Sequence, residues 1–286
     1  MAPKRKARST RNSKLAAAEE DTDPTSTNKT KGDQEVKGNS PTQPEESNNP
    51  ETTTTVKNYT LPFQKDKPLK CERRGKATTP SLIFTHGAGG GLATPATQDF
   101  ADGFADKASI VAFQATTNLP SRVQAFHAVM ENENFRTALG GRSMGGRAAT
   151  IAATQEKEQR QTDALVIVSF PLIGGKNKDS REQILLDLPR EVDVLFLSGS
   201  KDALCPLSEL AGVRERMKAR SWLLTVTGAN HGMEWKWKGS VRELRRLTGS
   251  MAAEWLESRD GGKRSCEIFW DEEAGKIGCA GWQDAS

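Results

Sequence analysis

The sequence predicts an α/β protein: a doubly wound, mostly parallel sheet, preceded by a disordered tail and followed by a β-hairpin. Three observations predict this class. Apolar runs such as 164–170 (ALVIVSF) and 192–198 (VDVLFLS) are nearly continuous, as in strands that helices cover on both faces. These runs alternate with segments of helical periodicity, which is typical of an open α/β sheet. No repeat of fixed period interrupts the alternation.

Composition divides the chain into three segments. Residues 1–55 contain no aromatic side chain and almost no aliphatic one, so they cannot bury enough apolar surface to offset the entropy of ordering. We therefore expect residues 1–55 to be a disordered basic and polar tail. Residues 56–258 are expected to form one α/β domain, and residues 259–286 a C-terminal hairpin extension.

The first 14 residues are basic, although the whole chain carries a formal net charge of only +4. Six Lys or Arg residues precede the first acidic one. This stretch is a solvated tail, a nuclear-import signal or an arm that contacts nucleic acid weakly. Beyond that weak contact we expect no nucleic acid partner, and we expect the protein in the cytoplasm, the nucleus or both.

Secretion, membrane insertion and metal binding are not expected. No apolar segment follows the basic start, and the longest apolar run is too short to cross a bilayer. The four cysteines lack C-x-x-C spacing and the chain has three histidines, so we expect neither a metal site nor another cofactor.

The elements follow in order along the chain. Strands are expected at 56–61, 81–85 (SLIFT), 110–114 (IVAFQ), 137–140 (TALG), 164–170, 192–198 and 221–227 (SWLLTVT). Ser121 is expected to cap a helix whose apolar residues have helical spacing: Val123, Phe126, Val129 and Met130. Small residues at 147–154 (RAATIAAT) form the next helix. A long helix closes the domain with apolar residues Val241, Leu244, Leu247, Met251 and Trp255.

The C-terminal segment alternates apolar and polar residues around a turn at DEEAGK. The expected hairpin register places Cys266 opposite Cys279, Ile268 opposite Ile277, and Trp270 opposite Gly275, which gives the hairpin one apolar face. A cross-strand disulfide is conceivable in this register. We expect free thiols instead, because cytosolic and nuclear compartments are reducing.

The segment LGGRSMGGR (139–147) contains the pattern G-x-S-x-G between a predicted strand and a predicted helix. That context is typical of a nucleophile elbow, where small neighbours let a serine adopt a strained backbone conformation. Ser143 is the candidate nucleophile. An ordinary glycine-rich turn remains the alternative interpretation of these residues alone.

An oxyanion hole needs two backbone N–H groups, one of them from the residue after the nucleophile, here Met144. The loop THGAGGG (85–91) follows an earlier strand and fits the second donor. We place that donor at Ala88, with Gly87 as the second choice. His86 is expected to shape this loop rather than to take protons.

A base and an acid are expected late in the chain, after the last two strands of the domain. His231 follows the last strand in TGANHGM and is the candidate base, whereas His127 lies in a helix with apolar periodicity and is expected to be a packing residue. Asp202 follows the preceding strand and is the candidate acid, although it could instead cap the helix after Pro206. Glu234 and Asp193 occupy unsuitable positions. The order Ser143, Asp202, His231 is that of α/β-hydrolases.

Two nucleotide-binding interpretations of the glycines fail. GAGGGL lacks the last glycine of G-x-G-x-x-G, because Leu92 stands there. GGRSMGGR lacks the Gly-Lys-Ser/Thr ending of a phosphate-binding P-loop.

Four segments carry a resemblance to a known family: LIFTHGAGG, GGRSMGGRAA, VLFLSGSKDALC and GANHG. Over roughly residues 56–258 the chain resembles the α/β-hydrolase-like domain shared by the testis-expressed protein thirty and the third regulatory subunit of the non-specific-lethal histone acetyltransferase complex. It is more distantly similar to dienelactone hydrolases, which carry cysteine where this chain has Ser143, so their substrate class is not carried over.

The resemblance implies an α/β-hydrolase fold and a triad of Ser143, Asp202 and His231. Residues 171–190, between two predicted strands, are too few for a large lid domain. The first hypothesis is a serine hydrolase that cleaves a small carboxylic ester or thioester through an acyl-enzyme. The second is a non-catalytic interaction module, in a nuclear or chromatin complex, that binds protein partners through its tails.

Overall fold

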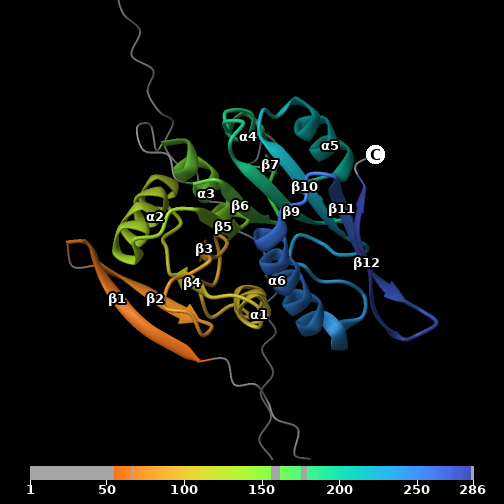
Figure 1. The fold of residues 1–286 in the computed structure, drawn as a ribbon, viewed down its shortest axis with the longest axis horizontal. Helices are drawn as coiled ribbons and strands as arrows, with labels where there is room; N and C mark the ends of the chain where they lie inside the picture. The colour runs from red at the N-terminus through yellow and green to blue at the C-terminus, as the bar shows by residue number, and fades with distance from the viewer. Residues whose placement is uncertain (1–54, 66, 156–161, 175–178, 285–286) are drawn as a thin grey trace, which may run out of the picture.

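A computed structural model describes residues 55–65, 67–155, 162–174 and 179–284. The expected disordered tail lies outside these residues except for residue 55. Ten strands form one sheet in the order β1-β2-β4-β3-β5-β6-β9-β10-β11-β12 (Figure 1). The strands are β1 (Val56–Gln64), β2 (Lys67–Arg74), β3 (Leu82–Thr85), β4 (Ile110–Phe113), β5 (Ala138–Arg142), β6 (Ala164–Val168), β9 (Asp193–Gly199), β10 (Arg220–Val226), β11 (Lys263–Asp271) and β12 (Lys276–Asp284).

The middle of the sheet is parallel and its edges are antiparallel. From β4 to β11 every neighbouring pair runs parallel. The pair β1–β2 adds antiparallel strands at one edge, and β12 adds one at the other. The carboxyl ends of the parallel strands therefore meet at one edge of the layer, which is where ligands bind in open α/β sheets.

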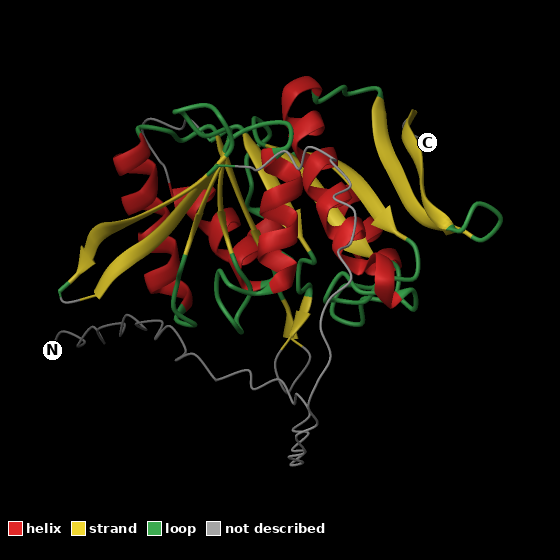
Figure 2. Cartoon of the chain, turned by 90° about the horizontal axis from the view of Figure 1, so that it is seen from below, coloured by secondary structure: helices red, strands yellow, loops and turns green. Residues whose placement is uncertain are grey.

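Helices cover both faces of the sheet, as Figures 1 and 2 show. One core cluster holds α2 (Leu119–Glu133), α3 (Met144–Gln155), α4 (Gln183–Leu186) and α5 (Leu207–Arg216). The other cluster holds α1 (Pro95–Ala105) and α6 (Val241–Ser258). In β6, Leu165 and Ile167 belong to the first cluster and Val166 to the second, so this central strand contributes to both cores. The predicted doubly wound α/β class is confirmed.

The helix predicted to follow a cap at Ser121 begins three residues earlier, at Leu119. Its N-cap is Asn118, whose side chain accepts a hydrogen bond from the Ser121 backbone N–H at 2.9 Å. Pro120 stands in the first turn, where its fixed φ suits a helix and its missing N–H costs nothing. The prediction of Ser121 as the cap was wrong because Asn is at least as good an N-cap and Pro120 starts the helix.

Several elements were not predicted. They are β2, α1, α4 and a small two-stranded sheet of β7 (Ile173–Gly174) and β8 (Asp179–Ser180), whereas α5 is the helix expected after Pro206. The strand β2 has mostly polar residues because it lies next to the sheet edge, so its sequence lacks the apolar signal of a buried strand.

The predicted C-terminal hairpin is present, but the predicted register was wrong. Ile268 lies opposite Cys279 and Trp270 opposite Ile277, because the turn occupies residues after Asp271, which pairs with Lys276. A bulge between Cys266 and Ile268 shifts the next pair, so Cys266 lies opposite Trp282. The Sγ atoms of Cys266 and Cys279 are still 3.7 Å apart, and both cysteines are free.

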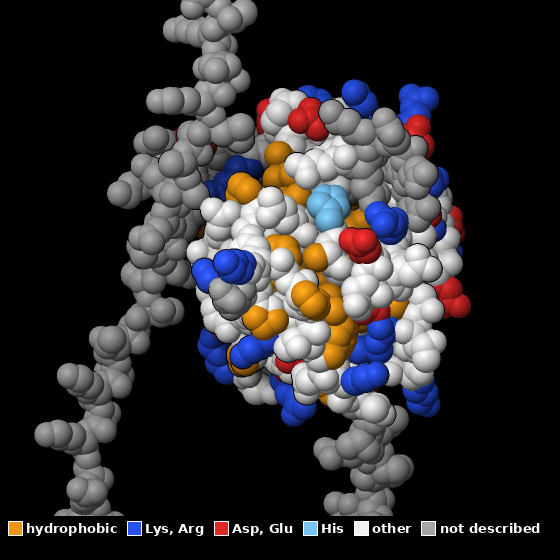
Figure 3. Space-filling view, turned by 90° about the vertical axis from the view of Figure 1, so that its left-hand side faces the viewer, with side chains coloured by type: hydrophobic (Ala, Val, Ile, Leu, Met, Phe, Trp, Pro, Cys, Tyr) orange, Lys and Arg blue, Asp and Glu red, His pale blue; other side chains and the backbone are white. Residues whose placement is uncertain are grey.

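The edge formed by β1, β2 and α2 lies on the left in Figure 1 and faces the reader in Figure 3. Hydrophobic side chains gather in the middle of this face, and Lys and Arg lie mostly around its rim in separate groups (Figure 3). This face therefore carries no continuous basic surface. Among the described residues, no helix combines the length and the apolar character that a membrane span requires.

Candidate active site

Ser143 lies on a sharp turn between β5 and α3 with a φ of 52°, a left-handed conformation that is rare for a residue other than glycine. The turn is possible because its neighbours are small. A Cβ atom on Gly141 would lie 2.3 Å from the backbone of Gly145, and one on Gly145 would lie 2.4 Å from the Thr85 carbonyl oxygen. The elbow therefore packs directly against the start of the loop that follows β3.

The structure brings the three predicted side chains together. His231 Nε2 lies 2.9 Å from Ser143 Oγ, and His231 Nδ1 lies 2.8 Å from Asp202 Oδ2. Ser143, Asp202 and His231 follow the carboxyl ends of β5, β9 and β10, respectively. Ser143 is 88 residues from His231 in the chain, and Asp202 is 29 residues from it. In this arrangement the serine hydroxyl donates to Nε2 while the Nδ1–H donates to the carboxylate.

Burial differs along this chain of hydrogen bonds. The side chain of Asp202 is fully buried, and that of His231 is 25% exposed. The second carboxylate oxygen of Asp202 accepts a hydrogen bond from the Leu204 backbone N–H at 2.9 Å. The carboxylate thus orients the His231 ring, and its second oxygen is satisfied by the turn that leads to α5. The alternative role, in which Asp202 caps that helix, does not apply, because the N-cap of α5 is Pro206.

Three groups hold the loop that carries His231. Arg142, the residue before the nucleophile, donates to the His231 carbonyl oxygen at 2.8 Å. Arg245 of α6 donates to the carbonyl oxygens of Gly232 and Met233. Asn230 closes the turn by accepting from the backbone N–H of Gly232 at 2.8 Å.

A cluster of three tryptophans supports the same loop from the C-terminal hairpin. Trp235 and Trp237 follow His231, and Trp270 lies in β11. Trp237 stacks on Trp270 with ring centroids 5.2 Å apart, and Trp235 meets both rings edge-on. Aromatic pairs of this kind stabilise by roughly 0.5–1.5 kcal/mol beyond their buried area. The hairpin therefore packs against the loop of the candidate base and stabilises it.

The two predicted oxyanion donors have no competing acceptor. Met144 is the first residue of α3, so its N–H has no partner within the helix. Within the described residues, no hydrogen bond engages the backbone N–H of Met144 or of Ala88. A Cβ on Gly87 would lie 3.6 Å from Ser143 Cβ, so the loop borders the serine. Both N–H groups are free to bind a substrate oxygen.

His86 is buried beneath this loop in a single neutral tautomer. Its Nδ1 faces the Gly87 carbonyl oxygen at 2.6 Å and therefore carries the proton, whereas Nε2 accepts from the Ala115 N–H at 3.0 Å. Burial, followed by the charge of Arg122, lowers the pKa of His86 to about 4. These contacts fit a residue that shapes the loop.

This shift predicts that acid destabilises the protein through His86. Unfolded histidine titrates near 6.5, so between about pH 6.5 and pH 4 the unfolded chain binds a proton that the folded chain does not, and stability falls as the pH falls. The loss attributable to His86 reaches at most about 3 kcal/mol. Urea unfolding from pH 7.5 to 4.5 should show it, and a His86→Asn variant should lose most of that slope. An unchanged slope in the variant would contradict the assignment.

The Alpha/beta hydrolase domain family matches residues 78–257, more than half of the chain. The chain belongs to this family. The match contains Ser143, Asp202 and His231, and it ends before the hairpin.

Solved structures of other α/β-hydrolases share the fold. Est1E from Butyrivibrio proteoclasticus is 13% identical, with a TM-score of 0.54 over 70% of this chain and 99% of that one. A dienelactone hydrolase from Anabaena variabilis is 16% identical, with a TM-score of 0.54 over 71% and 97%. Alpha/beta hydrolase domain-containing protein 10 from mouse is 15% identical, with a TM-score of 0.53 over 70% and 99%.

Among the described residues, none of the other candidates of this α/β-hydrolase domain forms a hydrogen bond with Ser143, Asp202 or His231. Glu234 pairs with Arg245 at 2.9 Å, and Asp193 pairs with Arg220 at 2.8 Å at the amino end of its strand. His127 lies on α2, half-buried. Among the described residues no group of side chains is arranged to hold a metal ion.

Sequence reasoning missed the arginines that surround the site. Arg142 lies inside the G-x-S-x-G motif, but its contact with the His231 loop could not be predicted from its position in the sequence. Arg122 did leave a signal: it precedes Phe126 by four residues and Val129 by seven, so it occupies an apolar position of α2. A charged residue there indicates a buried cation.

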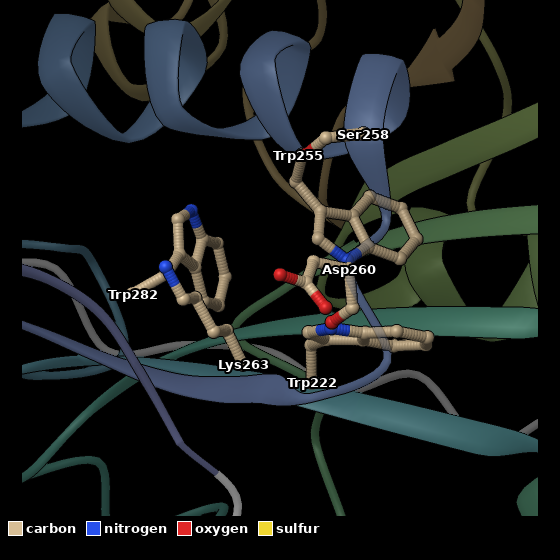
Figure 4. Close-up of a pocket in the computed structure, with 6 residues that line it drawn as sticks. All are labelled: Trp222, Trp255, Ser258, Asp260, Lys263 and Trp282. Carbon is tan, nitrogen blue, oxygen red and sulfur yellow. The ribbon is translucent and has the colours of Figure 1, made fainter.

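A cavity of about 360 Å³ lies at the opposite end of the strands. Figure 4 shows the indole of Trp282 facing those of Trp222 and Trp255 across it. Trp222 is near the start of β10 and Lys263 begins β11, whereas Ser143 and His231 follow strand ends. The cavity is therefore remote from the candidate active site.

Proposed function

We propose that this protein is a serine hydrolase that cleaves carboxylic esters or thioesters. The observation that carries the proposal is the hydrogen-bonded series Ser143–His231–Asp202, at 2.9 and 2.8 Å, beside two backbone N–H groups with no acceptor in the described protein. A hydroxyl, an imidazole and a carboxylate aligned in this order, with two backbone donors beside the serine, support acyl transfer.

In the proposed reaction His231 Nε2 takes the hydroxyl proton as Ser143 Oγ attacks the substrate carbonyl carbon. The carbonyl oxygen becomes an oxyanion bound by the N–H groups of Met144 and Ala88. Asp202 holds the ring tautomer and stabilises the imidazolium. His231 then protonates the departing alcohol or thiol, which leaves an acyl-enzyme. Water, deprotonated by the same nitrogen, attacks that ester and releases the acid and Ser143.

The substrate is proposed to be a small or accessible acyl group. The segment between β6 and β9 contains only short elements, β7, β8 and α4, in its described part. The glycine-rich loop 87–95 on the other side is likewise short. Neither segment has the length of a lid domain, which supports an open site.

A fluorophosphonate probe tests the proposal, since it phosphonylates activated serines. We expect the full-length protein to be labelled at Ser143, and the Ser143→Ala and His231→Ala variants to lose labelling. His127→Ala is the matched control and should label like the parent, because among the described residues His127 forms no hydrogen bond with Ser143, Asp202 or His231. An unlabelled parent, or labelling that survives Ser143→Ala, would overturn the proposal.

The alternative of a non-catalytic interaction module is not favoured, because binding alone needs no aligned hydroxyl, imidazole and carboxylate. Membership of the subfamily of the testis-expressed protein thirty and the non-specific-lethal complex subunit remains part of the proposal, supported by the four quoted motifs. Protein partners that bind through the tails, and a location in the nucleus or the cytoplasm, are also parts of the proposal. A fluorescent fusion lacking residues 1–14 tests nuclear import: an unchanged distribution would exclude it.

A further inference from the structure

Arg122 is an unusual buried cation. Its side chain lies in α2 and is 0% exposed. In the described part of the chain no carboxylate forms an ion pair with it. It also lies close to the N-terminus of α2, where the helix dipole disfavours positive charge. Burying an unpaired charge is costly, so stability does not explain an arginine at this position.

The donors of Arg122 converge on backbone oxygens of the loop beside the serine. Nη1 donates to the His86 carbonyl oxygen, and Nη2 donates to that of Gly87 at 3.3 Å. Nε and Nη2 also donate to the Thr116 carbonyl oxygen at 2.9 and 2.8 Å, which anchors the guanidinium from the loop after β4. Two consecutive carbonyls of the loop are thus fixed by one rigid planar group.

The Gly87 carbonyl belongs to the same peptide group as the Ala88 N–H. In a trans peptide the C=O and N–H bonds point in opposite directions, and no cis peptide bond occurs among the described residues. Holding the Gly87 oxygen between Arg122 Nη2 and His86 Nδ1 therefore turns the Ala88 N–H away from Arg122. A cation bound to the oxygen also polarises the peptide and strengthens its N–H as a donor.

We propose that Arg122 is a positioning residue for the oxyanion hole: its guanidinium fixes the Gly87–Ala88 peptide so that the Ala88 N–H faces the reacting carbonyl oxygen. This rests on the proposed hydrolase function. Burial lowers the pKa of Arg122 to about 10, which leaves the guanidinium charged at neutral pH.

The first test compares full-length Arg122→Met and Arg122→Lys variants with the parent. The readouts are the rate constant of phosphonylation and the kcat and KM for p-nitrophenyl acetate. Removing one oxyanion donor lowers kcat by about 10²-fold or more, and we expect that loss for Arg122→Met with KM unchanged. Arg122→Lys keeps the charge but not the planar fork, so its loss should be smaller, about 10-fold.

Arg214→Met is the matched control. Arg214 of α5 is also a partly buried arginine that donates to a backbone oxygen, but this oxygen belongs to Ser221 near the amino end of β10. Its substitution should lower the melting temperature while kcat stays within about twofold of the parent. An equal fall of kcat in Arg214→Met would mean that Arg122 acts only through general stability, and would overturn the proposal.

A double-mutant cycle with Ala88→Pro decides whether Arg122 acts through the Ala88 N–H, because proline has no N–H. We expect the double variant to be no slower than Ala88→Pro alone. Multiplied losses would overturn the proposal, and so would a folded Arg122→Met that reacts as fast as the parent. If Arg122→Met does not fold, Arg122→Lys replaces it in the cycle with the same two outcomes. An unlabelled parent, by contrast, overturns the hydrolase function itself.

Discussion

Asp202→Asn is expected to lower kcat by about 10⁴-fold while the fold stays intact. The asparagine is nearly the same size, but its amide nitrogen would face His231 Nδ1 as a donor, where Asp202 Oδ2 now accepts at 2.8 Å. The ring would then favour the tautomer with the proton on Nε2, which cannot take the proton of Ser143 Oγ. Steady-state hydrolysis of p-nitrophenyl acetate measures the effect.

The control separates the carboxylate of Asp202 from the turn that it supports. Asp202 Oδ1 accepts the Leu204 N–H, and an asparagine oxygen can still accept there. The melting temperature should therefore change much less than the rate. A variant with the rate of the parent would show that another group orients His231, and the proposed role of Asp202 would be wrong.

Gly103→Ala is expected to destabilise the protein by roughly 3 kcal/mol or more, the upper range for overpacking a core. A Cβ on Gly103 of α1 would lie 1.8 Å from the Arg246 carbonyl oxygen of α6. A Cβ on Gly249 of α6 would likewise lie 2.1 Å from the Phe100 carbonyl oxygen of α1. The two helices touch backbone to backbone, so the methyl group can be accommodated only if they separate. We expect a melting temperature lower by roughly 10 °C in calorimetry.

Gly212→Ala is the matched control, because Gly212 also lies inside a helix, α5. A Cβ there would meet no atom within 4 Å. Alanine should therefore stabilise the protein by about 0.5–1 kcal/mol through the loss of unfolded-state entropy. If Gly103→Ala were as stable as Gly212→Ala, the close approach of α1 and α6 would not exist in solution.

The parallel strands could be predicted because burial on both faces leaves an unbroken apolar run, as in 164–170. The relative placement of Ser143, Asp202 and His231 could be predicted for a topological reason: each follows a parallel strand, and all such strand ends meet at one edge. Their distances could not be predicted, because they depend on turn geometry.

What sequence could not predict depends on pairings between distant segments. The hairpin register depends on where the turn after Asp271 closes, and an alternating pattern does not reveal this; nor does it reveal the extra residue of the bulge between Cys266 and Ile268. The contact between Trp237 and Trp270 joins residues that are far apart in the chain. The contact of Arg122 with Gly87 likewise required the fold, since only the packing of α2 against the loop brings them together.

The stacking of Trp270 on Trp237 bears on the order in which this protein is synthesised. Ser143, Asp202 and His231 have all left the ribosome before residues 263–284, which supply β11 and β12. Until those last strands pair with β10, the indoles of the loop after His231 lack the ring that they stack on. We expect nascent chains to become reactive toward a serine probe only after residues 263–284 have emerged from the ribosome, so that the candidate site depends on a segment outside the family match.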